Sequence, residues 1–174
     1  HEGLKNMYRI LLETNDNIKD VFVPKTFLQA TTMEIYNEIY DSKSSPSPRA
    51  NNIISSWFLN GSVVGDITDF RPAVIHYFMK QCIEVIHTNG DSTVDTYLLA
   101  CVSWYKCHEK RHTLHKPSEV WCKSIFEEDS AASFLPVGRI YSRFCPIVGE
   151  VTLVGRQKEN VLVVNPLQQK CAAE

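Results

Sequence analysis

The chain has 174 residues, of which 44% are hydrophobic and 22% are charged, and its formal net charge is −2. This length suits one hydrophobic core rather than two, and the composition is typical of a folded globular domain rather than a disordered chain. No apolar run approaches the roughly 20 residues that span a bilayer, so we expect no membrane contact. The near-neutral charge also excludes a nucleic-acid binder that is basic over its whole surface.

The chain begins at His1, with neither an initiator methionine nor a visible signal peptide. We therefore interpret it as a piece of a larger polypeptide. Three of its six cysteines, Cys82, Cys101 and Cys122, lie inside apolar or amphipathic stretches. Because a free cysteine behaves as a small hydrophobic residue, we expect buried free thiols rather than disulfides.

The N-terminal part of the sequence predicts one helix and a few short strands. Apolar residues recur at helical spacing over residues 4–13, which predicts a helix. Residues 31–40 alternate in polarity and are rich in Thr, Ile and Tyr, which predicts one strand. Residues 42–52 contain two prolines and four serines and predict a loop. Residues 52–58 fit either a short strand or a turn of helix.

From residue 73 onward the sequence predicts strands separated by turns. Residues 73–86 are rich in β-forming residues, and the Asn89-Gly90-Asp91 that follows is a strong hairpin signal. Residues 94–105 are apolar on both faces of a strand, which favours a central place in a sheet. Further strands are expected at residues 119–126, 135–144, 148–154 and 161–164. Short strands at this spacing are typical of a small barrel or sandwich.

One predicted loop concentrates candidate metal ligands, since four Cys or His side chains lie within nine residues: Cys107, His108, His112 and His115. Zinc takes these ligand types, and Cys122 is a further candidate, but structural zinc normally draws its second pair from a distant segment. A solvated hairpin loop explains the same residues without a metal. We therefore predict neither a metal site nor a cofactor.

The same loop is the basic cluster of the sequence. Between residues 104 and 123, five Lys or Arg residues accompany two acids, which gives a net charge of +3. Such a loop suits contact with phosphates, which gives salt-dependent affinity for nucleic acid. A solvated charged loop is the alternative. The predicted nucleic-acid contacts are Lys106, Lys110, Arg111 and Lys116.

Enzyme chemistry finds no positive support in the sequence. Asp66 and Asp69 form an acidic pair of the kind used in metal binding or acid–base chemistry, but a turn explains them equally well. A nuclease of the ribonuclease-H type needs further acids on strands covered by long helices. The sequence contains no Gly-x-Ser-x-Gly elbow and no Gly-rich phosphate loop. We predict that the chain is not an enzyme.

Three fragments occur in order along the second half of the chain. Residues 100–105 read Ala-Cys-Val-Ser-Trp-Tyr, residues 119–121 read Glu-Val-Trp, and residues 135–140 read Leu-Pro-Val-Gly-Arg-Ile, with Cys145 after them. In this order and approximate spacing, residues 74–146 resemble the BAH (bromo-adjacent homology) domain, a β-barrel-like chromatin module. The resemblance implies a nuclear location and a histone tail, a nucleosome or DNA as the partner.

Some BAH domains bind methylated lysine in an aromatic cage, in which several ring faces surround the cation. The resemblance places Tyr77 at the first cage position and Trp104 at the second. The third position is Lys106, which repels a cation unless it turns away, and Tyr105 is a ring that could replace it. Tyr77, Trp104 and Tyr105 are therefore the predicted ligand-binding residues. Packing inside the core is the alternative for these aromatic side chains.

Residues 38–57, together with the BAH-like half, are similar to the C-terminal region of large open reading frames from mobile-element-rich genomes. This similarity implies a transposon-derived parent protein. For the fold we expect a mainly β chain. Its parts are an N-terminal extension at residues 1–70, with one helix and short strands packed on the barrel, a small BAH-like β-barrel at residues 71–165, and a C-terminal tail at residues 166–174.

The leading functional hypothesis from the sequence is a non-catalytic interaction module that associates with chromatin or DNA. The first alternative is a protein–protein assembly module that joins the parent polypeptide to another protein or to a second copy. A metal-binding enzyme domain that uses the Cys and His residues of the basic loop is the third hypothesis.

Overall fold

A computed structural model describes residues 2–12, 17–46, 50–56, 58–59, 62–63, 70–114, 118–152 and 158–165. Its elements in chain order are α1 (Glu2–Leu12), β1 (Ile18–Phe22), β2 (Leu28–Ala30), β3 (Thr32–Ile35), β4 (Glu38–Asp41), β5 (Asn52–Ser55), β6 (Phe58–Leu59), β7 (Ser62–Val63), β8 (Arg71–His87), β9 (Ser92–Cys107), β10 (Glu119–Phe126), η1 (Ala131–Ser133), β11 (Phe134–Pro136), η2 (Val137–Arg139), β12 (Ile140–Arg143), β13 (Ile147–Thr152) and β14 (Lys158–Val164).

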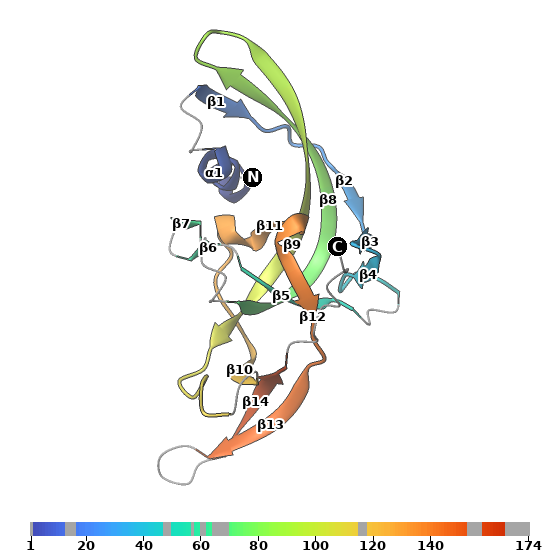
Figure 1. Ribbon diagram of the computed structural model, residues 1–174, viewed down its shortest axis with the longest axis vertical. Helices are drawn as coiled ribbons and strands as arrows, with labels where there is room; N and C mark the ends of the chain where they lie inside the picture. The colour runs from blue at the N-terminus through green and yellow to red at the C-terminus, as the bar shows by residue number, and fades with distance from the viewer. Residues whose placement is uncertain are drawn as a thin grey trace, which may run out of the picture.

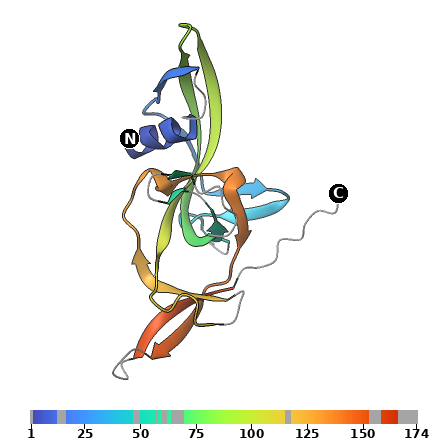
Figure 2. The same cartoon turned by 60° about the vertical axis from the view of Figure 1, so that its left-hand side comes forward.

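The fold is mainly β, as predicted, with one N-terminal helix and a strongly curled, half-barrel sheet (Figure 1). The main path of the sheet runs β12-β5-β8-β9-β10-β14-β13, and β1, β2 and β11 pair with the long central strands beside this path. The β9 strand lies between β8 and β10, so its predicted central place is confirmed. Figure 2 shows the β8–β9 hairpin and the β13–β14 ribbon at opposite ends of the molecule.

The turn between β8 and β9 confirms the predicted hairpin. The backbone amide of His87 donates to the carbonyl of Asp91 at 2.9 Å, and that of Gly90 donates to the carbonyl of His87 at 3.1 Å. Three residues therefore form the loop, and Gly90 at its third position has a φ of 91°. This is the known three-residue hairpin in which a residue with positive φ follows a type I turn.

A β-bulge bends β8 at His76. Ile75 pairs with Val102, and the next pair is Tyr77 with Cys101, so His76 is an extra residue on β8. Its imidazole Nε2 lies 2.7 Å from the hydroxyl of Ser103. A bulge increases the local bend and twist of a strand, and this one lies where β8 curves between β5 and β2.

Two clusters of buried side chains form the core. The larger one lies under α1 and the β8–β9 hairpin, and it includes Tyr8, whose ring meets Tyr97 edge-on at 5.1 Å. The smaller one surrounds Trp121, where β5, β8, β10 and β14 meet. The cation–π contact of Trp121 with Arg111, at 4.3 Å from the ring centroid, covers this second cluster. The two clusters occupy different parts of the same continuous sheet.

The N-terminal part of the chain contributes directly to the sheet and the core. Strands β1, β2 and β5 all form antiparallel pairs with β8. Helix α1 confirms the predicted helix, and Leu4, Met7 and Tyr8 on its inner face are buried. The division into an extension at 1–70 and a barrel at 71–165 stays a prediction, and the tail at 166–174 lies outside the described residues.

Two predicted strands are instead broken by turns. Residues 31–40 form the hairpin β3–β4, in which Tyr36 and Asn37 have φ values of 51° and 62°. Two consecutive positive φ angles are the mark of a type I′ turn, which matches the twist of the flanking strands. Residues 135–144 divide into β11 and β12, because η2 follows Pro136 and includes Gly138. Both residues are known breakers of regular structure.

The cysteines correct another expectation. The five described ones, Cys82, Cys101, Cys107, Cys122 and Cys145, are free thiols as predicted. Three of them are exposed, however, namely Cys82, Cys107 and Cys145, and neither of the others is fully buried. The prediction of burial is therefore wrong for the described cysteines. Successive side chains of a strand point to opposite faces of the sheet. A cysteine within an apolar stretch of sequence therefore need not lie on the buried face.

Candidate functional site

The three predicted ligand-binding aromatic residues do not share one site. Trp104 and Tyr105 are neighbours on β9, where successive side chains point to opposite faces. Trp104 is only 5% exposed and belongs to the larger core cluster, whereas Tyr105 is 7% exposed and belongs to the smaller one. The Trp104 Nε1 donates to the carbonyl of Ala132 at 2.8 Å, and the Tyr105 hydroxyl donates to Asn52 Oδ1 at 3.2 Å. Both polar groups are thus satisfied inside the fold.

The basic loop uses part of its charge to hold itself in place. Lys106 is exposed, but the Lys110 ammonium donates to the carbonyl of Thr152 on β13. The Arg111 guanidinium pairs with Glu119 at 2.9 Å and donates to the carbonyl of Phe70 at 3.2 Å. Two of the predicted nucleic-acid contacts therefore have internal partners.

Among the residues that the structure describes, no group of three or more Cys, His, Asp or Glu side chains could hold a metal ion. His108 is buried, and its Nδ1 accepts a hydrogen bond from the Lys110 amide at 3.0 Å. Its Nε2 lies 3.5 Å from the Glu159 carboxylate. These contacts fix the imidazole as a structural element of the loop, beside the exposed Cys107. Other residues that the sequence singled out lie outside the described residues: Asp66, Asp69, His115, Lys116 and Cys171.

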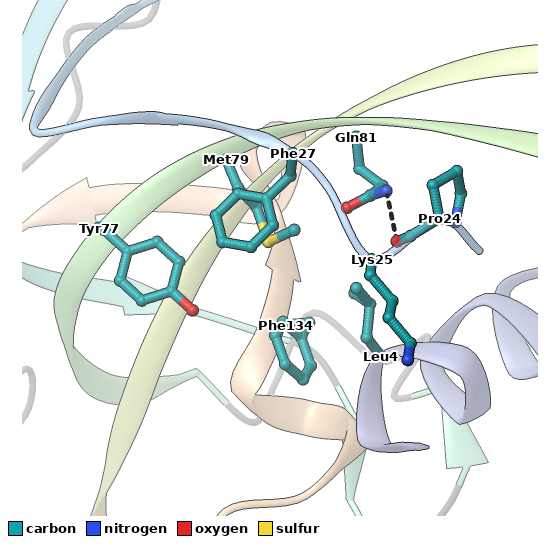
Figure 3. Close-up of a pocket in the computed structure, with 8 residues that line it drawn as sticks. All are labelled: Leu4, Pro24, Lys25, Phe27, Tyr77, Met79, Gln81 and Phe134. Carbon is teal, nitrogen blue, oxygen red and sulfur yellow. Dashed lines mark hydrogen bonds between the residues drawn. The ribbon is translucent and has the colours of Figure 1, made fainter. Parts of the chain in front are cut away.

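Tyr77 lies in a different place, an aromatic pocket that sequence patterns did not predict. The cavity has a volume of about 160 Å³. Its wall joins elements that are distant in sequence, since α1, the crossover between β1 and β2, the middle of β8 and the start of β11 all contribute (Figure 3). We call this the aromatic pocket, and its lining residues are Leu4, Pro24, Lys25, Phe27, Tyr77, Met79, Gln81 and Phe134.

The crossover between β1 and β2 forms the outer wall of the aromatic pocket. Because both strands pair with β8, the intervening residues must bridge the gap between the two pairings. The rings of Phe27 and Tyr77 are stacked, with centroids 6.1 Å apart and planes 12° apart. Phe27 remains 41% exposed, so the wall also faces solvent. The result is an opening framed by ring faces, which is typical of a site for an apolar or cationic group.

Gln81 is the polar residue at the back of the pocket. Its side chain is fully buried, and its Nε2 donates to the carbonyls of Pro24 at 3.2 Å and Thr26 at 3.1 Å. These two acceptors fix the orientation of the amide, because the flipped amide would place oxygen against oxygen. The Oε1 atom has no hydrogen-bond partner, and Figure 3 shows it turned from Pro24 toward the Phe27 side of the pocket.

The charge around the pocket is simple. Burial first, and then a hydrogen bond to Cys101, raise the pKa of Tyr77 to about 12, so its hydroxyl stays neutral at physiological pH. That hydroxyl donates to the Cys101 thiol. Lys25 is the one charged residue among the described lining residues. Figure 3 shows its side chain on the side of the pocket opposite Tyr77.

A second, more open cavity of about 250 Å³ adjoins the first at Pro24 and Phe27. Leu28, which is 71% exposed, and Lys80 extend the surface there. The crossover thus presents Phe27 to two neighbouring hollows, and each of them also has one lysine. This arrangement forms a continuous surface large enough for more than one residue of a bound chain.

The sequence contained a weak signal for this site. Gln81 interrupts a run of β-forming residues in a predicted long strand, and a polar residue at a buried strand position needs hydrogen-bond partners. Phe27 carried no comparable signal, because its role depends on where the crossover between β1 and β2 lies. Tyr77 was singled out by the BAH resemblance, but its neighbours in space differ from those that the resemblance implies.

Comparisons of the chain with protein-family models, with curated proteins and with solved structures find no match. The resemblance to BAH domains and the transposon-derived parent therefore stay predictions. Within the described residues, no helix has the length and apolar character to cross a membrane.

Proposed function

We propose that this chain is a non-catalytic interaction module that captures a side chain of a partner protein in the aromatic pocket. The observation that carries the proposal is the unpartnered, buried Oε1 of Gln81 in a pocket otherwise lined mainly by apolar groups. A buried acceptor without a partner costs about 1–3 kcal/mol. A donor on a bound chain that reaches this oxygen removes that cost.

The size of the pocket supports a side chain rather than a complete small molecule. Pockets for drug-sized ligands usually enclose ~300–1,000 Å³, whereas this one encloses about 160 Å³. Protein interfaces draw most of their affinity from a few anchor side chains that fill such pockets. The exposed Phe27 and Leu28 beside the opening provide apolar surface for the residues next to the anchor.

The BAH resemblance favours chromatin as the setting of this interaction, in the nucleus. The histone tail that it implies is the alternative partner segment, because histone tails are basic and Lys25 lines the pocket. Direct contact with DNA is the less favoured form, because two cations of the basic loop, Lys110 and Arg111, have partners inside the fold. Binding assays with nucleosomes and with bare duplex DNA distinguish these two forms of the interaction. Binding to nucleosomes alone supports a histone partner, and binding to bare DNA that weakens with salt supports phosphate contact.

The test of the proposed function is a selection of random 15-residue peptides on the immobilised chain. We expect the selected peptides to lose at least about tenfold in affinity for Phe27→Ala, because Phe27 lines both cavities. Ile125→Ala is the matched control, since Ile125 is an exposed apolar residue on β10 that lines neither cavity. Equal affinities for wild type and Phe27→Ala would exclude the aromatic pocket as the binding site.

A second candidate function is assembly with another copy through β13. Within the described part of the chain, β13 pairs with β14 alone, and Ile147 and Val148 on it are exposed. An edge strand with exposed apolar residues is a ready site for pairing with a further strand. Sedimentation equilibrium tests this candidate. A concentration-dependent dimer that Val148→Lys abolishes supports it, and a monomer at all concentrations excludes it.

A further inference from the structure

We propose that the side chain held in the aromatic pocket is the indole of a tryptophan, on a partner segment with acidic residues beside it. This inference rests on the proposed function and specifies its ligand. The juxtaposition that carries it is a buried, unpartnered carbonyl oxygen on Gln81, ring faces from Phe27, Tyr77 and Phe134, and an ammonium group on Lys25.

The hydrogen-bonding capacity of the pocket selects a donor. The Gln81 Nε2 is already used by two backbone carbonyls, and the Tyr77 hydroxyl donates to Cys101. The pocket therefore offers an acceptor, the Oε1 of Gln81, while these two donors are occupied. A group that only donates satisfies this site completely. The indole N–H is a donor without an acceptor, whereas a tyrosine hydroxyl has lone pairs that would remain without a donor.

The apolar wall selects a flat ring. Phe27 and Tyr77 are nearly parallel, with an interplanar angle of 12°, and Phe134 and Met79 complete the wall. Aromatic rings pack favourably in offset-stacked or edge-to-face arrangements on such faces, and a thioether packs favourably at a ring edge. Among side chains, tryptophan combines the largest apolar ring area with a single polar donor, and it is enriched among anchor residues of interfaces.

The charge at the opening excludes a cation and favours an anion nearby. Lys25 lines the aromatic pocket and Lys80 lines the adjoining cavity. A lysine, methylated lysine or arginine in the pocket would meet the Lys25 ammonium as a like charge. A carboxylate within the pocket would meet the Gln81 oxygen. A carboxylate next to the tryptophan on the partner chain avoids that oxygen and lies within reach of the lysines.

The first experiment measures the binding of four small molecules to the protein, using the NMR signals of labelled methionine methyl groups. The chain has three methionines. Met79 and Met7 are both buried in the larger core cluster, but only Met79 lines the pocket, and Met33 lies on β3. The probes are 3-methylindole, 3-methylbenzothiophene, p-cresol and tetramethylammonium. The benzothiophene has nearly the shape of the indole but lacks its N–H donor, so it isolates the hydrogen bond to Gln81.

We expect 3-methylindole to shift the Met79 signal, to leave Met33 unchanged, and to bind at least about tenfold more tightly than 3-methylbenzothiophene. A site built around a hydrogen bond discriminates strongly against an analogue that lacks it. Phe27→Ala should weaken the Met79 response. If 3-methylbenzothiophene, p-cresol or tetramethylammonium binds as tightly as 3-methylindole, the indole assignment is overturned while the pocket remains a binding site. If no probe shifts Met79, the assignment is also overturned, and the peptide selection decides the proposed function separately.

The second experiment tests the acidic flanks with two peptides, acetyl-Glu-Trp-Glu-amide and acetyl-Lys-Trp-Lys-amide. We expect the acidic peptide to bind about threefold more tightly at low salt, because exposed charge pairs contribute little. Lys25→Glu should remove or reverse this preference, whereas Lys106→Glu, at an exposed lysine that lines neither cavity, should leave it intact. A preference for the basic peptide, or an acidic preference that survives in Lys25→Glu, would overturn the assignment of the flanking charge to Lys25.

Discussion

The guanidinium carbon of Arg111 lies 4.3 Å from the centroid of the Trp121 ring, and one carboxylate, that of Glu119, binds both side chains. The Arg111 Nε donates to Glu119 Oε2 at 2.9 Å, and the Trp121 Nε1 donates to the same oxygen at 3.1 Å. The cation that sequence assigned to phosphate contact therefore covers the smaller core cluster. The sequence alone does not reveal whether a basic side chain contacts a partner at the surface or packs over the core.

Arg111→Ala should lower the free energy of unfolding by about 1–2 kcal/mol, because it removes the ion pair with Glu119 and the contact with the Trp121 ring. Lys106→Ala, which removes an exposed charge from the same loop, should change it by less than about 0.5 kcal/mol. Urea denaturation measures both variants. Equal stabilities, together with a reduced salt dependence of DNA binding in Arg111→Ala, would restore the phosphate-contact role.

Trp104→Ala should destabilise the fold by about 3–5 kcal/mol, the usual result of removing a large buried aromatic side chain. Phe27→Ala is the contrasting variant, since Phe27 is 41% exposed and its loss leaves no closed cavity. It should cost far less stability and weaken peptide binding. Thermal melts and peptide affinities, measured on the same preparations, distinguish the structural role of Trp104 from the binding role of Phe27. A Trp104→Ala variant with wild-type stability and no binding would show instead that Trp104 is a ligand residue.

Much of the sheet could be predicted because its strands carry strong local signals. Residues 94–105 are apolar on both faces, and this pattern identified the central strand β9. Asn89-Gly90 identified the hairpin, since a turn residue with positive φ has a clear composition. The β3–β4 hairpin was missed because Tyr36, a bulky residue, occupies a positive φ of 51°. Such a conformation is uncommon for tyrosine, so the alternating pattern appeared unbroken.

The candidate site depended on long-range pairing and was therefore harder to predict. The aromatic pocket exists because the crossover between β1 and β2 passes over Gln81 while Phe134 arrives from β11. No periodicity within β8 places Phe27 against Tyr77. The resemblance singled out Tyr77, but the neighbouring rings that it implied, Trp104 and Tyr105, are buried in the two core clusters. Composition identifies aromatic residues, and only the strand register decides which of them share a cavity.

Gly90→Ala should lower the stability by about 1 kcal/mol, because a φ of 91° is strained for any residue with a Cβ. The space around Gly90 is open, with no atom within 4 Å of an added Cβ, so the backbone conformation is the whole cause. Gly138→Ala is the matched control, since its surroundings are equally open and its φ lies outside the positive range. Differential scanning calorimetry should show a lower melting temperature for Gly90→Ala alone. Equal losses in both variants would contradict the turn geometry.

His76, the extra residue of the β8 bulge, should make the stability depend on pH. Burial first, and then the Lys43 ammonium, lower the pKa of its imidazole below the ordinary value of 6.5, while Asp129 opposes this shift. Between the folded and unfolded pKa values the unfolded chain binds more protons, so stability rises with pH. The contribution of His76 is therefore present above about pH 6.5 and is lost as the pH falls below it.

The test of this dependence is urea denaturation of wild type and His76→Asn at pH 7.5 and 5.5. The other histidines are common to both proteins, so the difference between the two pH dependences reports on His76. At pH 7.5 His76→Asn should be the less stable protein, because it loses the imidazole contact with Ser103, which is 2.7 Å long. At pH 5.5 this difference should shrink, because protonation of His76 then favours the unfolded wild-type chain. A difference that grows toward pH 5.5 would mean that the folded protein stabilises the imidazolium, contrary to the partial burial of this side chain.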